Sequence, residues 1–253
     1  MSKHLLEAKD LTVTFESFGY EIQAVRNVNL HLDKGEVIGI VGESGSGKST
    51  VARVLSGLQT PTSGSVLFEG EPIVKDGVAY PGEMRKAVQM VFQDPYSSLN
   101  PRMRILNAVS EAVMQHQTNN RKDAEEIAIN LLKRMGISAV DSRKYPMSLS
   151  GGQRQRASVA RALSAQPRIL IADEPTSAID QSAQSQLLEL FTELMKDGLS
   201  IVLISHDLGV IRYLSDRVYV MESGIFVETG KAMDIFNNPK NPYTQRLIAS
   251  IPK

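Results

Sequence analysis

The segment at residues 42–50 constrains the fold of this chain more than any other part of its sequence. It reads Gly-Glu-Ser-Gly-Ser-Gly-Lys-Ser-Thr, follows an unbroken apolar run at 37–41 and precedes helix-compatible residues at 51–55. Small residues let backbone N–H groups wrap closely around phosphate oxygens, and the positive end of a following helix points at the same anion. A buried strand, a glycine-rich loop and a helix in this order predict a phosphate-binding loop in an α/β protein.

Each residue type in this loop has a distinct use in holding a nucleotide. The glycines supply backbone freedom, and we expect Lys48 to reach the β and γ phosphates of ATP. We expect the Ser49 hydroxyl to ligate Mg²⁺ and Thr50 to donate a hydrogen bond to a nearer phosphate. The complete loop site that we predict is Gly42, Glu43, Ser44, Gly45, Ser46, Gly47, Lys48, Ser49 and Thr50.

The apolar patterns along the chain predict two kinds of sheet. Residues 11–15 and 24–32 alternate apolar and polar side chains on either side of a turn-prone stretch around Gly19, which indicates antiparallel strands with one wet face. The apolar runs at 169–172 and 201–204 are typical of strands buried on both faces of a parallel sheet. Two further strands are expected at 218–221 and 225–228, with a turn at Ser223 and Gly224 between them.

Helical periodicity predicts an insertion within this α/β core. Apolar residues recur at helical spacing from 124 to 135, before a stop at Gly136, and again from 186 to 195. Between 95 and 165 there are helix signals and no good strand. We therefore predict one domain, with an α/β core and its antiparallel part at 1–94 and 166–235, a helical subdomain at 95–165 and a short C-terminal tail at 236–253.

Composition excludes several other classes of protein. The 28 basic and 28 acidic residues give a formal net charge of zero, which argues against nucleic acid as the main partner. Cysteine is absent and the four histidines show no zinc-site spacing, so disulfide frameworks and thiolate metal sites are excluded. No apolar run approaches the roughly 20 residues that span a bilayer, and the N-terminus does not resemble a signal peptide. We therefore expect a cytoplasmic chain that reaches a membrane only through a partner.

Three polar sites follow apolar stretches and are candidates for one nucleotide crevice. Asp173 and Glu174 come directly after the run at 169–172, at the strand end where open α/β sheets bind ligands. Asp173 suits a role in Mg²⁺ binding, and Glu174 could orient or deprotonate the attacking water. His206 follows the next apolar run and could contact the γ-phosphate and that water. Gln93 follows a short apolar stretch, and its carbonyl oxygen can hold Mg²⁺ or water, but it is singled out only by the family resemblance described next.

Together with these residues, a Leu-Ser-Gly-Gly-Gln motif at 149–153 makes the chain resemble the nucleotide-binding subunit of an ATP-binding cassette (ABC) transporter. The resemblance covers nearly the whole chain, with the motifs in the expected order. It implies the fold of an ABC nucleotide-binding domain, with a P-loop ATPase core, an antiparallel β subdomain and a helical subdomain. By this resemblance the Q-loop contains Gln93, Walker B ends at Asp173 with the catalytic Glu174 beside it, the D-loop is Ser177 to Asp180, and the switch histidine is His206.

Three further stretches resemble the oligopeptide, dipeptide and nickel importers of this family. They are the Q-loop region at 92–101, the segment at 205–210 and the Asn-Pro-Lys-Asn-Pro-Tyr-Thr-Gln-Arg segment at 238–246. The resemblance implies an assembly with two transmembrane permease subunits and an extracytoplasmic substrate-binding protein, at the cytoplasmic face of the plasma membrane. It also implies a second ABC ATPase, which is often a different chain in this group, although both halves of a composite site are present here and an identical copy would also fit.

Two positions need comment against the usual family pattern. Ile179 stands where leucine is usual in the D-loop, a volume-conserving change that should be tolerated. The aromatic residue that stacks on adenine precedes the P-loop in this family, and Phe15 is our first candidate by its place in the strand. Tyr20 and Phe18 are the alternatives, and core or hairpin packing would also account for each of the three.

The resemblance also implies how the signature segment works. Ser150, Gly151, Gly152 and Gln153 would begin a helix and offer N–H groups and a hydroxyl to the γ-phosphate of ATP held by a second subunit. Asp180 of the D-loop belongs to the same set of nucleotide-binding residues. The sequence does not encode the cargo, so peptide, nickel and a metal chelate are alternatives. An exporter cassette and a non-transport cassette in DNA repair or translation are alternatives for the function.

Overall fold

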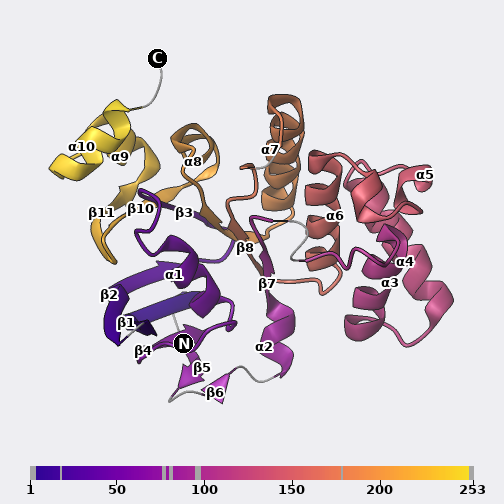
Figure 1. Cartoon of the computed structure of the whole chain (residues 1–253), viewed down its shortest axis with the longest axis horizontal. Helices are drawn as coiled ribbons and strands as arrows, with labels where there is room; N and C mark the ends of the chain where they lie inside the picture. Colours follow the sequence, from indigo (N-terminus) through magenta and orange to yellow (C-terminus); the bar gives the residue numbers. More distant parts are fainter. Residues whose placement is uncertain are drawn as a thin grey trace. The chain divides into compact units, whose positions relative to one another are not determined.

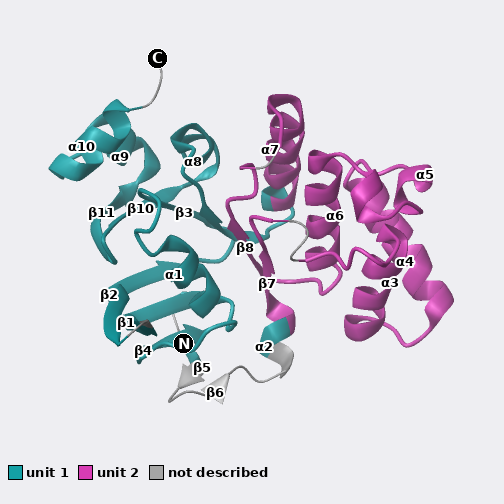
Figure 2. Ribbon diagram, viewed as in Figure 1, with its two compact units in different colours: residues 1–85, 195–253 teal, residues 86–194 magenta. Residues whose placement is uncertain are grey.

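The computed structural model describes residues 4–17, 19–75, 78–79, 82–94, 98–177 and 179–250. Figure 1 shows the strands and helices in chain order, and Figure 2 shows that they separate into two compact units. Unit 1 comprises residues 1–85 and 195–253, and unit 2 comprises residues 86–194. Unit 1 is therefore formed by two separate segments of the chain, and unit 2 by the segment between them.

Unit 1 contains the antiparallel sheet that the alternating N-terminal segments predict. Its strands are β1 (Leu6–Ser17), β2 (Tyr20–Leu32), β4 (Ser63–Phe68), β5 (Glu71–Lys75) and β6 (Val78–Ala79), in the spatial order β2-β1-β4-β5-β6. The two predicted segments form the β1–β2 hairpin, in which Leu6 pairs with Leu32. Leu11 in this hairpin is fully buried, whereas Tyr20 and Ile22 near its tip are exposed. The hairpin is therefore anchored by an apolar side and ends in exposed apolar side chains.

A second, mixed sheet in unit 1 carries two of the continuous apolar runs. The strands that unit 1 contributes to it are, in spatial order, β11 (Ile225–Lys231), β10 (Arg217–Glu222), β3 (Val37–Val41) and β9 (Ser200–Ile204). The helices of unit 1 are α1 (Lys48–Leu55), α8 (Leu208–Leu214), α9 (Ala232–Asn237) and α10 (Pro242–Ala249). β3 runs parallel to both β9 and β10, and β10 is antiparallel to β11. Every residue of β3 and β9 is buried, as expected for strands covered on both faces. The predicted fold class, an α/β core with a mixed sheet and an antiparallel part, is confirmed.

Unit 2 combines two parallel strands with a series of helices. Its elements are β7 (Val88–Val91), α3 (Ile105–His116), α4 (Arg121–Arg134), α5 (Ala139–Ser142), the 3-10 helix η2 (Pro146–Ser148), α6 (Gly151–Leu163), β8 (Ile169–Asp173) and most of α7 (Gln181–Lys196). From residue 98 to residue 165, all of which are described, the chain forms helices and turns and no strand. Among the residues that the structure describes, no helix is both long and apolar enough to cross a bilayer.

The structure adds elements that the sequence patterns did not predict. The strands β4, β5 and β6 were not expected, and α2 (Gly82–Ala87) leads into the short strand β7, which precedes Gln93. The segment that we expected to be a tail contains the helix α10, which begins at a proline as helices often do. Unit 2 also extends beyond the expected helical insertion, because β7, β8 and most of α7 group with its helices.

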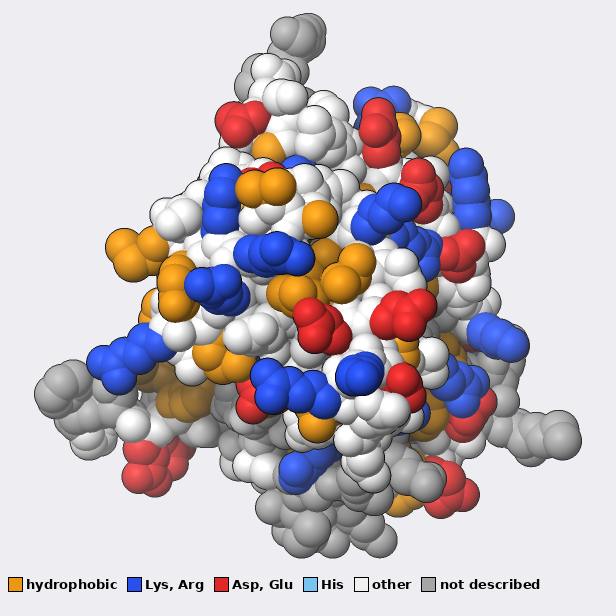
Figure 3. All heavy atoms as spheres, turned by 90° about the vertical axis from the view of Figure 1, so that its right-hand side faces the viewer, with side chains coloured by type: hydrophobic (Ala, Val, Ile, Leu, Met, Phe, Trp, Pro, Cys, Tyr) orange, Lys and Arg blue, Asp and Glu red, His pale blue; other side chains and the backbone are white. Residues whose placement is uncertain are grey.

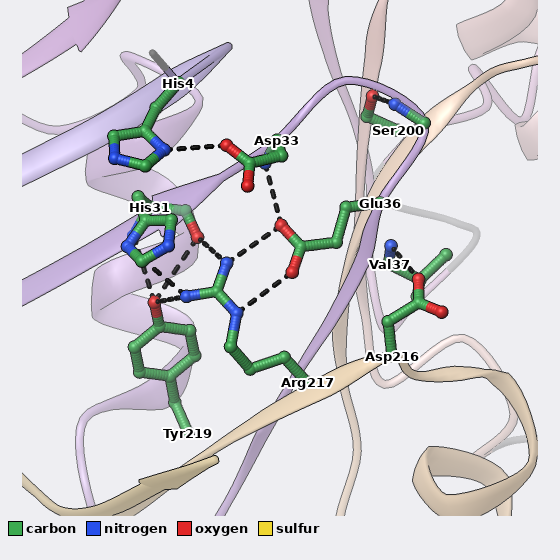
Figure 4. Close-up of polar contacts among 10 residues, drawn as sticks. His4, His31, Asp33, Glu36, Val37, Ser200, Asp216, Arg217 and Tyr219 are labelled. Atoms are coloured by element: carbon green, nitrogen blue, oxygen red, sulfur yellow. Dashed lines mark hydrogen bonds and ion pairs between the residues drawn. The ribbon is translucent and has the colours of Figure 1, made fainter. Parts of the chain in front are cut away.

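A polar network in unit 1 ties the start of β10 to the turn before β3 (Figure 4). The Arg217 guanidinium donates to both carboxylate oxygens of Glu36, from Nε at 2.9 Å and from Nη2 at 2.8 Å. Its Nη1 donates to the Tyr219 hydroxyl at 2.6 Å, and the same hydroxyl accepts the backbone N–H of His31 at 3.0 Å. A bidentate pair of this kind fixes the relative positions of the two groups more firmly than a single charge contact.

The network makes protonation of His31 unfavourable. Burial holds the pKa of His31 below its ordinary value of 6.5, the nearby Arg217 and His4 act in the same direction, and Asp33 and Glu36 oppose them. The unfolded chain therefore binds a proton at this position at higher pH than the folded chain does. It follows that His31 reduces stability as the pH drops below about 6.5.

We expect the His31→Gln variant to lose less stability than the wild-type chain when the pH is lowered from about 7 to about 5. Glutamine has no protonated form, so the unfolded state gains nothing from acidification at this position. Urea denaturation midpoints at the two pH values would measure the difference. Equal losses in the two proteins would contradict this account of His31.

Candidate nucleotide-binding site

The predicted phosphate loop lies in unit 1 between β3 and α1, and its backbone depends on glycine. Gly42, Gly45 and Gly47 all have positive φ, at 155°, 78° and 108°. A Cβ atom on Gly42 would lie 2.1 Å from the carbonyl oxygen of Met221, and one on Gly47 would lie 2.3 Å from that of Ala24. Neither position has room for a side chain, so the loop can hold this path only with glycine there.

The ammonium group of Lys48 is held against the backbone of this loop. The side chain is 6% exposed, and its Nζ donates to the carbonyl oxygens of Gly42 and Glu43, each at 2.8 Å. α1 begins at Lys48, and its N-cap residue Gly47 makes no side-chain capping hydrogen bond. An ammonium group and the positive end of a helix are therefore directed at one place, an arrangement that suits a phosphate.

Ser46 supplies a test of whether this loop fits a nucleotide. Its hydroxyl is buried, at 5% exposure of the residue, and has no hydrogen-bond partner within the described part of the chain. The backbone around it is fixed, because the Ser46 N–H donates to Glu43 at 3.2 Å and its carbonyl accepts from Gly224 at 2.9 Å. A buried hydroxyl without a partner is unfavourable, and a phosphate oxygen would satisfy it. The residues of the loop therefore fit the group that the sequence predicts.

His206 lies at the same edge of the mixed sheet in unit 1 as the phosphate loop. β3 and β9 are parallel, and Ile40 pairs with Ile204. Gly42 and His206 each come two residues after this pair, and the His206 side chain is exposed. Both segments thus leave the sheet at the carboxyl ends of its strands, where ligands of open α/β sheets bind.

Three predicted site residues lie together in unit 2, after the paired strands β7 and β8. Val91 pairs with Ala172, so Gln93 and Glu174 each stand two residues beyond the pair and Asp173 stands one beyond it. Asp173 is 5% exposed, Glu174 is half-buried and Gln93 is exposed. Glu174 has a φ of 50°, an uncommon backbone conformation for a residue with a side chain. Strain of this kind is frequent at functional sites, and here it falls on the predicted catalytic carboxylate.

The signature segment forms a capping box at the start of α6. The Ser150 hydroxyl accepts the Gln153 backbone N–H at 3.2 Å, and the Gln153 side-chain oxygen accepts the Ser150 N–H at 3.0 Å. Gln153 also donates from Nε2 to Asp141 at 3.1 Å. Ser150 is exposed, and because its oxygen acts as the acceptor in the cap, its hydroxyl proton can still be donated to a phosphate.

Gly152 has a packing role in the signature. It is buried, and a Cβ atom at this position would lie 2.4 Å from the Cβ atom of Ala183 in α7. In the next turn of α6, the Arg156 guanidinium donates to the Gln186 side chain of α7 at 2.9 Å. The two helices therefore approach closely at this glycine.

We expect Gly152→Ala to lower the free energy of unfolding by about 1–3 kcal/mol, because the added methyl group overlaps Ala183. Gly151→Ala is the matched control, since Gly151 is half-buried in the same helical turn and the exchange has the same effect on backbone entropy. Denaturant midpoints of the two variants would show the difference. If they matched, the close contact between α6 and α7 would not be what requires glycine.

The D-loop aspartate begins the next helix. Asp180 is exposed and its carboxylate accepts the Ala183 backbone N–H at 2.9 Å, so it caps α7. Ile179 is half-buried. Ala178 of the same loop lies outside the described residues. Asp180 therefore fixes the start of α7.

The candidates for stacking on adenine lie around the tip of the β1–β2 hairpin. Phe15 pairs with Ile22 and is 40% exposed, and Tyr20 is 76% exposed. Phe18 lies outside the described residues. Both described rings thus have surface that a base could cover, and Phe15 remains our first choice.

Sequence reasoning missed one residue that contacts the phosphate loop. Tyr243 of α10 is 5% exposed, and its hydroxyl accepts the backbone N–H of Glu43 at 3.0 Å. The sequence pointed to this segment only through its resemblance to a Pro-Tyr-Thr motif. No local pattern reveals a contact between residues 200 positions apart.

Comparisons with known proteins identify the family. The profile of the family described as ABC transporter matches residues 25–177, and that described as the oligopeptide/dipeptide transporter, C-terminal region, matches residues 227–253. The oligopeptide transport ATP-binding protein OppD of Bacillus subtilis is 45% identical over 257 residues, which cover 98% of this chain and 72% of that protein. The oligopeptide transport ATP-binding protein AmiF of Streptococcus pneumoniae is 40% identical over 255 residues, which cover 100% of this chain and 83% of that protein.

A solved structure supports the same assignment. The ATP-binding cassette MJ0796, in the dimeric structure of its post-hydrolysis state bound to ADP and Pi, matches 90% of this chain and 98% of its own with a TM-score of 0.80 and 29% identity. The chain therefore belongs to the ABC transporter family, as an ATP-binding subunit and ATPase with the C-terminal region of the oligopeptide and dipeptide transporters.

Proposed function

We propose that this chain holds ATP with Mg²⁺ at its phosphate loop and hydrolyses it to energise an importer of peptides. The observation that carries the nucleotide site is the buried Ser46 hydroxyl, which has no hydrogen-bond partner among the described residues and lies in the glycine-dependent loop that also holds Lys48. On ATP binding, Lys48 would exchange the Gly42 and Glu43 carbonyls for β and γ phosphate oxygens. Thr50 would donate to a nearer phosphate, and the backbone N–H groups of the loop would complete the cradle.

Hydrolysis requires a base, and Glu174 is the residue that we propose for it. A carboxylate within hydrogen-bond reach of a water molecule can take its proton as the water attacks phosphorus. His206 would contact the γ-phosphate and the same water. Ser49, Gln93 and Asp173 are the oxygen donors that we propose for Mg²⁺, a hard cation that prefers carboxylate, carbonyl and hydroxyl ligands. When bound, Mg²⁺ supplies charge neutralisation at the β and γ phosphates.

We also propose that the signature segment acts on nucleotide held by a second cassette. Ser150 is exposed at the start of α6, and the capping box leaves the Gly151 and Gly152 N–H groups, which have no acceptor within the helix, to meet an anion. Ser150, Gly151, Gly152 and Gln153 would thereby bind the γ-phosphate on the partner subunit, with Asp180 nearby on the D-loop. Two ATP molecules would join two cassettes, and the loss of γ-phosphate would let them separate.

The helical part of unit 2 has a surface suited to a permease. Figure 3 shows hydrophobic side chains among basic and acidic ones on the face that carries α3, α4 and α5. Around α5 and η2, Val140 is 71% exposed, Tyr145 is 46% exposed and Met147 is 75% exposed. Exposed apolar groups bordered by charges are typical of protein interfaces. We propose that a segment of a transmembrane permease docks on this face, with the Q-loop residue Gln93 contributing.

The oligopeptide relatives favour peptide as the cargo, and nickel or a metal chelate is the second candidate. Beyond the family's cassette dimer and permeases, we propose a second cassette that is a different chain, with an identical copy as the alternative, and an extracytoplasmic substrate-binding protein. The complex would place this chain at the cytoplasmic face of the plasma membrane.

Purification of the tagged chain from its native membranes in mild detergent tests the assembly. We expect two permeases and a second, distinct cassette to co-purify and to be identified by mass spectrometry. Reconstituted in vesicles with a substrate-binding protein, the complex should move labelled oligopeptides toward the side on which ATP is hydrolysed. In the vesicle assay, movement of peptide away from that side would indicate an exporter, and uptake of nickel without uptake of peptide would identify nickel as the cargo. In the purification, recovery of soluble nucleic-acid machinery in place of permeases would overturn the transport role.

A further inference from the structure

The C-terminal segment of the chain is fixed to unit 1 by a set of backbone contacts. The Glu228 carboxylate on β11 accepts the N–H groups of Lys240 at 2.8 Å and of Asn241 at 3.0 Å. The Asn241 side chain then caps α10 by accepting the Tyr243 N–H at 2.8 Å. The start of α10, and with it the direction of the Tyr243 side chain, is therefore set by hydrogen bonds rather than by loose contact with the surface.

Tyr243 brings this segment to the phosphate loop. The residue is 5% exposed, and its hydroxyl oxygen accepts the Glu43 N–H at 3.0 Å. That N–H belongs to the peptide group whose carbonyl, on Gly42, accepts from Lys48 Nζ at 2.8 Å. One peptide group at the start of the loop is thus held at its N–H by Tyr243 and at its oxygen by Lys48.

We propose that Tyr243 is a positioning residue, which orders the first peptide of the phosphate loop before ATP arrives. The inference rests on the proposed role of this loop in holding ATP. When Lys48 turns to the phosphates, the Gly42 carbonyl loses that donor, and the Tyr243 hydroxyl keeps the peptide in place. A loop that is already ordered does not lose its backbone freedom on binding, so affinity is higher than for a mobile loop.

The test compares two variants of the purified full chain, each lacking one buried hydroxyl. Tyr243→Phe removes the acceptor for the Glu43 N–H. Tyr219→Phe is the matched control, because the Tyr219 hydroxyl is also buried in unit 1 and also accepts a backbone N–H, that of His31, at 3.0 Å. The hydrogen bonds of the Tyr219 hydroxyl lie in the network of Figure 4, where its partners are His31 and Arg217 and not residues of the phosphate loop. A general loss of stability would therefore affect both variants, whereas a loss of order in the phosphate loop would affect only Tyr243→Phe.

We expect Tyr243→Phe to weaken binding of ATP with Mg²⁺ by roughly threefold to tenfold, the range for one neutral hydrogen bond. The KM for ATP should rise in proportion while kcat changes by less than about twofold, because the hydroxyl does not touch the reacting atoms. Tyr219→Phe should leave both constants unchanged. A purely structural role would instead lower the melting temperature of both variants and leave the ATP affinity of the folded protein as it was.

Hydrogen exchange provides a second measurement that does not need activity. In Tyr243→Phe without nucleotide, amide exchange should rise in a peptide that covers residues 42–47 and stay unchanged in one that covers β9. Equal exchange and equal ATP affinity in Tyr243→Phe and wild type would overturn the inference. If the wild-type chain itself bound no ATP, the proposed function would fail first. Binding by the wild type with no effect of Tyr243→Phe would remove only the role of Tyr243.

Discussion

Glu174→Gln should bind ATP about as well as the wild-type chain and hydrolyse it at least about a hundredfold more slowly. Glutamine keeps the size and hydrogen-bonding shape of the side chain but cannot take a proton from water, and general base catalysis typically contributes factors of about 10² to 10⁴. Phosphate release under saturating ATP would measure turnover, and titration with a fluorescent ATP analogue would measure binding. The expected pattern is a fall in kcat with little change in the dissociation constant.

The control for this variant is Glu189→Gln, which makes the same chemical change at an exposed position of α7 in the same unit. It should leave turnover unchanged. The comparison is informative because Glu174 has a φ of 50°, an uncommon backbone conformation for a residue with a side chain, whereas Glu189 lies within a regular helix. Turnover near the wild-type rate in Glu174→Gln would remove this residue from the catalytic role.

Lys48→Ala should weaken ATP binding by at least about tenfold, and up to about a hundredfold. The ammonium group is buried and already held at the loop by two carbonyl oxygens, so it needs little reordering to meet a phosphate. Hydrogen bonds to charged groups contribute about 1.5–3 kcal/mol, which corresponds to this range of affinity. The measurement is the same ATP titration, and Lys34→Ala, in an exposed turn of the same unit, serves as the control. Unchanged affinity in Lys48→Ala would count against the phosphate-loop interpretation as a whole.

The sequence predicted the central strands of the fold accurately. The apolar runs at 37–41, 169–172 and 201–204 correspond to β3, β8 and β9 within one residue at either end. Strands buried on both faces carry apolar side chains on both sides, so each appears in the sequence as a continuous apolar run. Each run is bounded by charged or small residues. The β1–β2 hairpin was also predicted, although its strands extend further than the alternation indicated because bulges shift the pairing register of β1.

Other elements gave weaker sequence signals. β7 has only four residues, one of them Gln89, so its apolar pattern is too short to distinguish a strand from a loop. β4 begins with Ser-Gly-Ser, a composition more typical of turns. The start of α10 depends on Glu228 accepting two backbone N–H groups from residues 240 and 241, a contact that no local pattern encodes. These elements exist because of tertiary contacts rather than local preference.

Some residues of the candidate site could be predicted from the sequence, and others could not. The loop at 42–50 could be predicted from residue types alone, because close backbone approach requires glycine whatever the rest of the fold contains. Gln93 was found only through resemblance, since a single glutamine after a short apolar stretch carries little information. The contact of Tyr243 with Glu43 was not predicted, because it joins two segments through one hydroxyl group.

The contact between α6 and α7 also determines how unit 2 can move. The space at Gly152 is too small for a methyl group, and Arg156 bonds to Gln186 one turn further along α6. Two helices packed this closely would clash if one moved along the other. They should therefore move together as one rigid body. Asp180 stands at the start of one helix and Ser150 at the start of the other. A displacement of the D-loop should therefore move the signature segment at the same time, because the two helices carry both motifs.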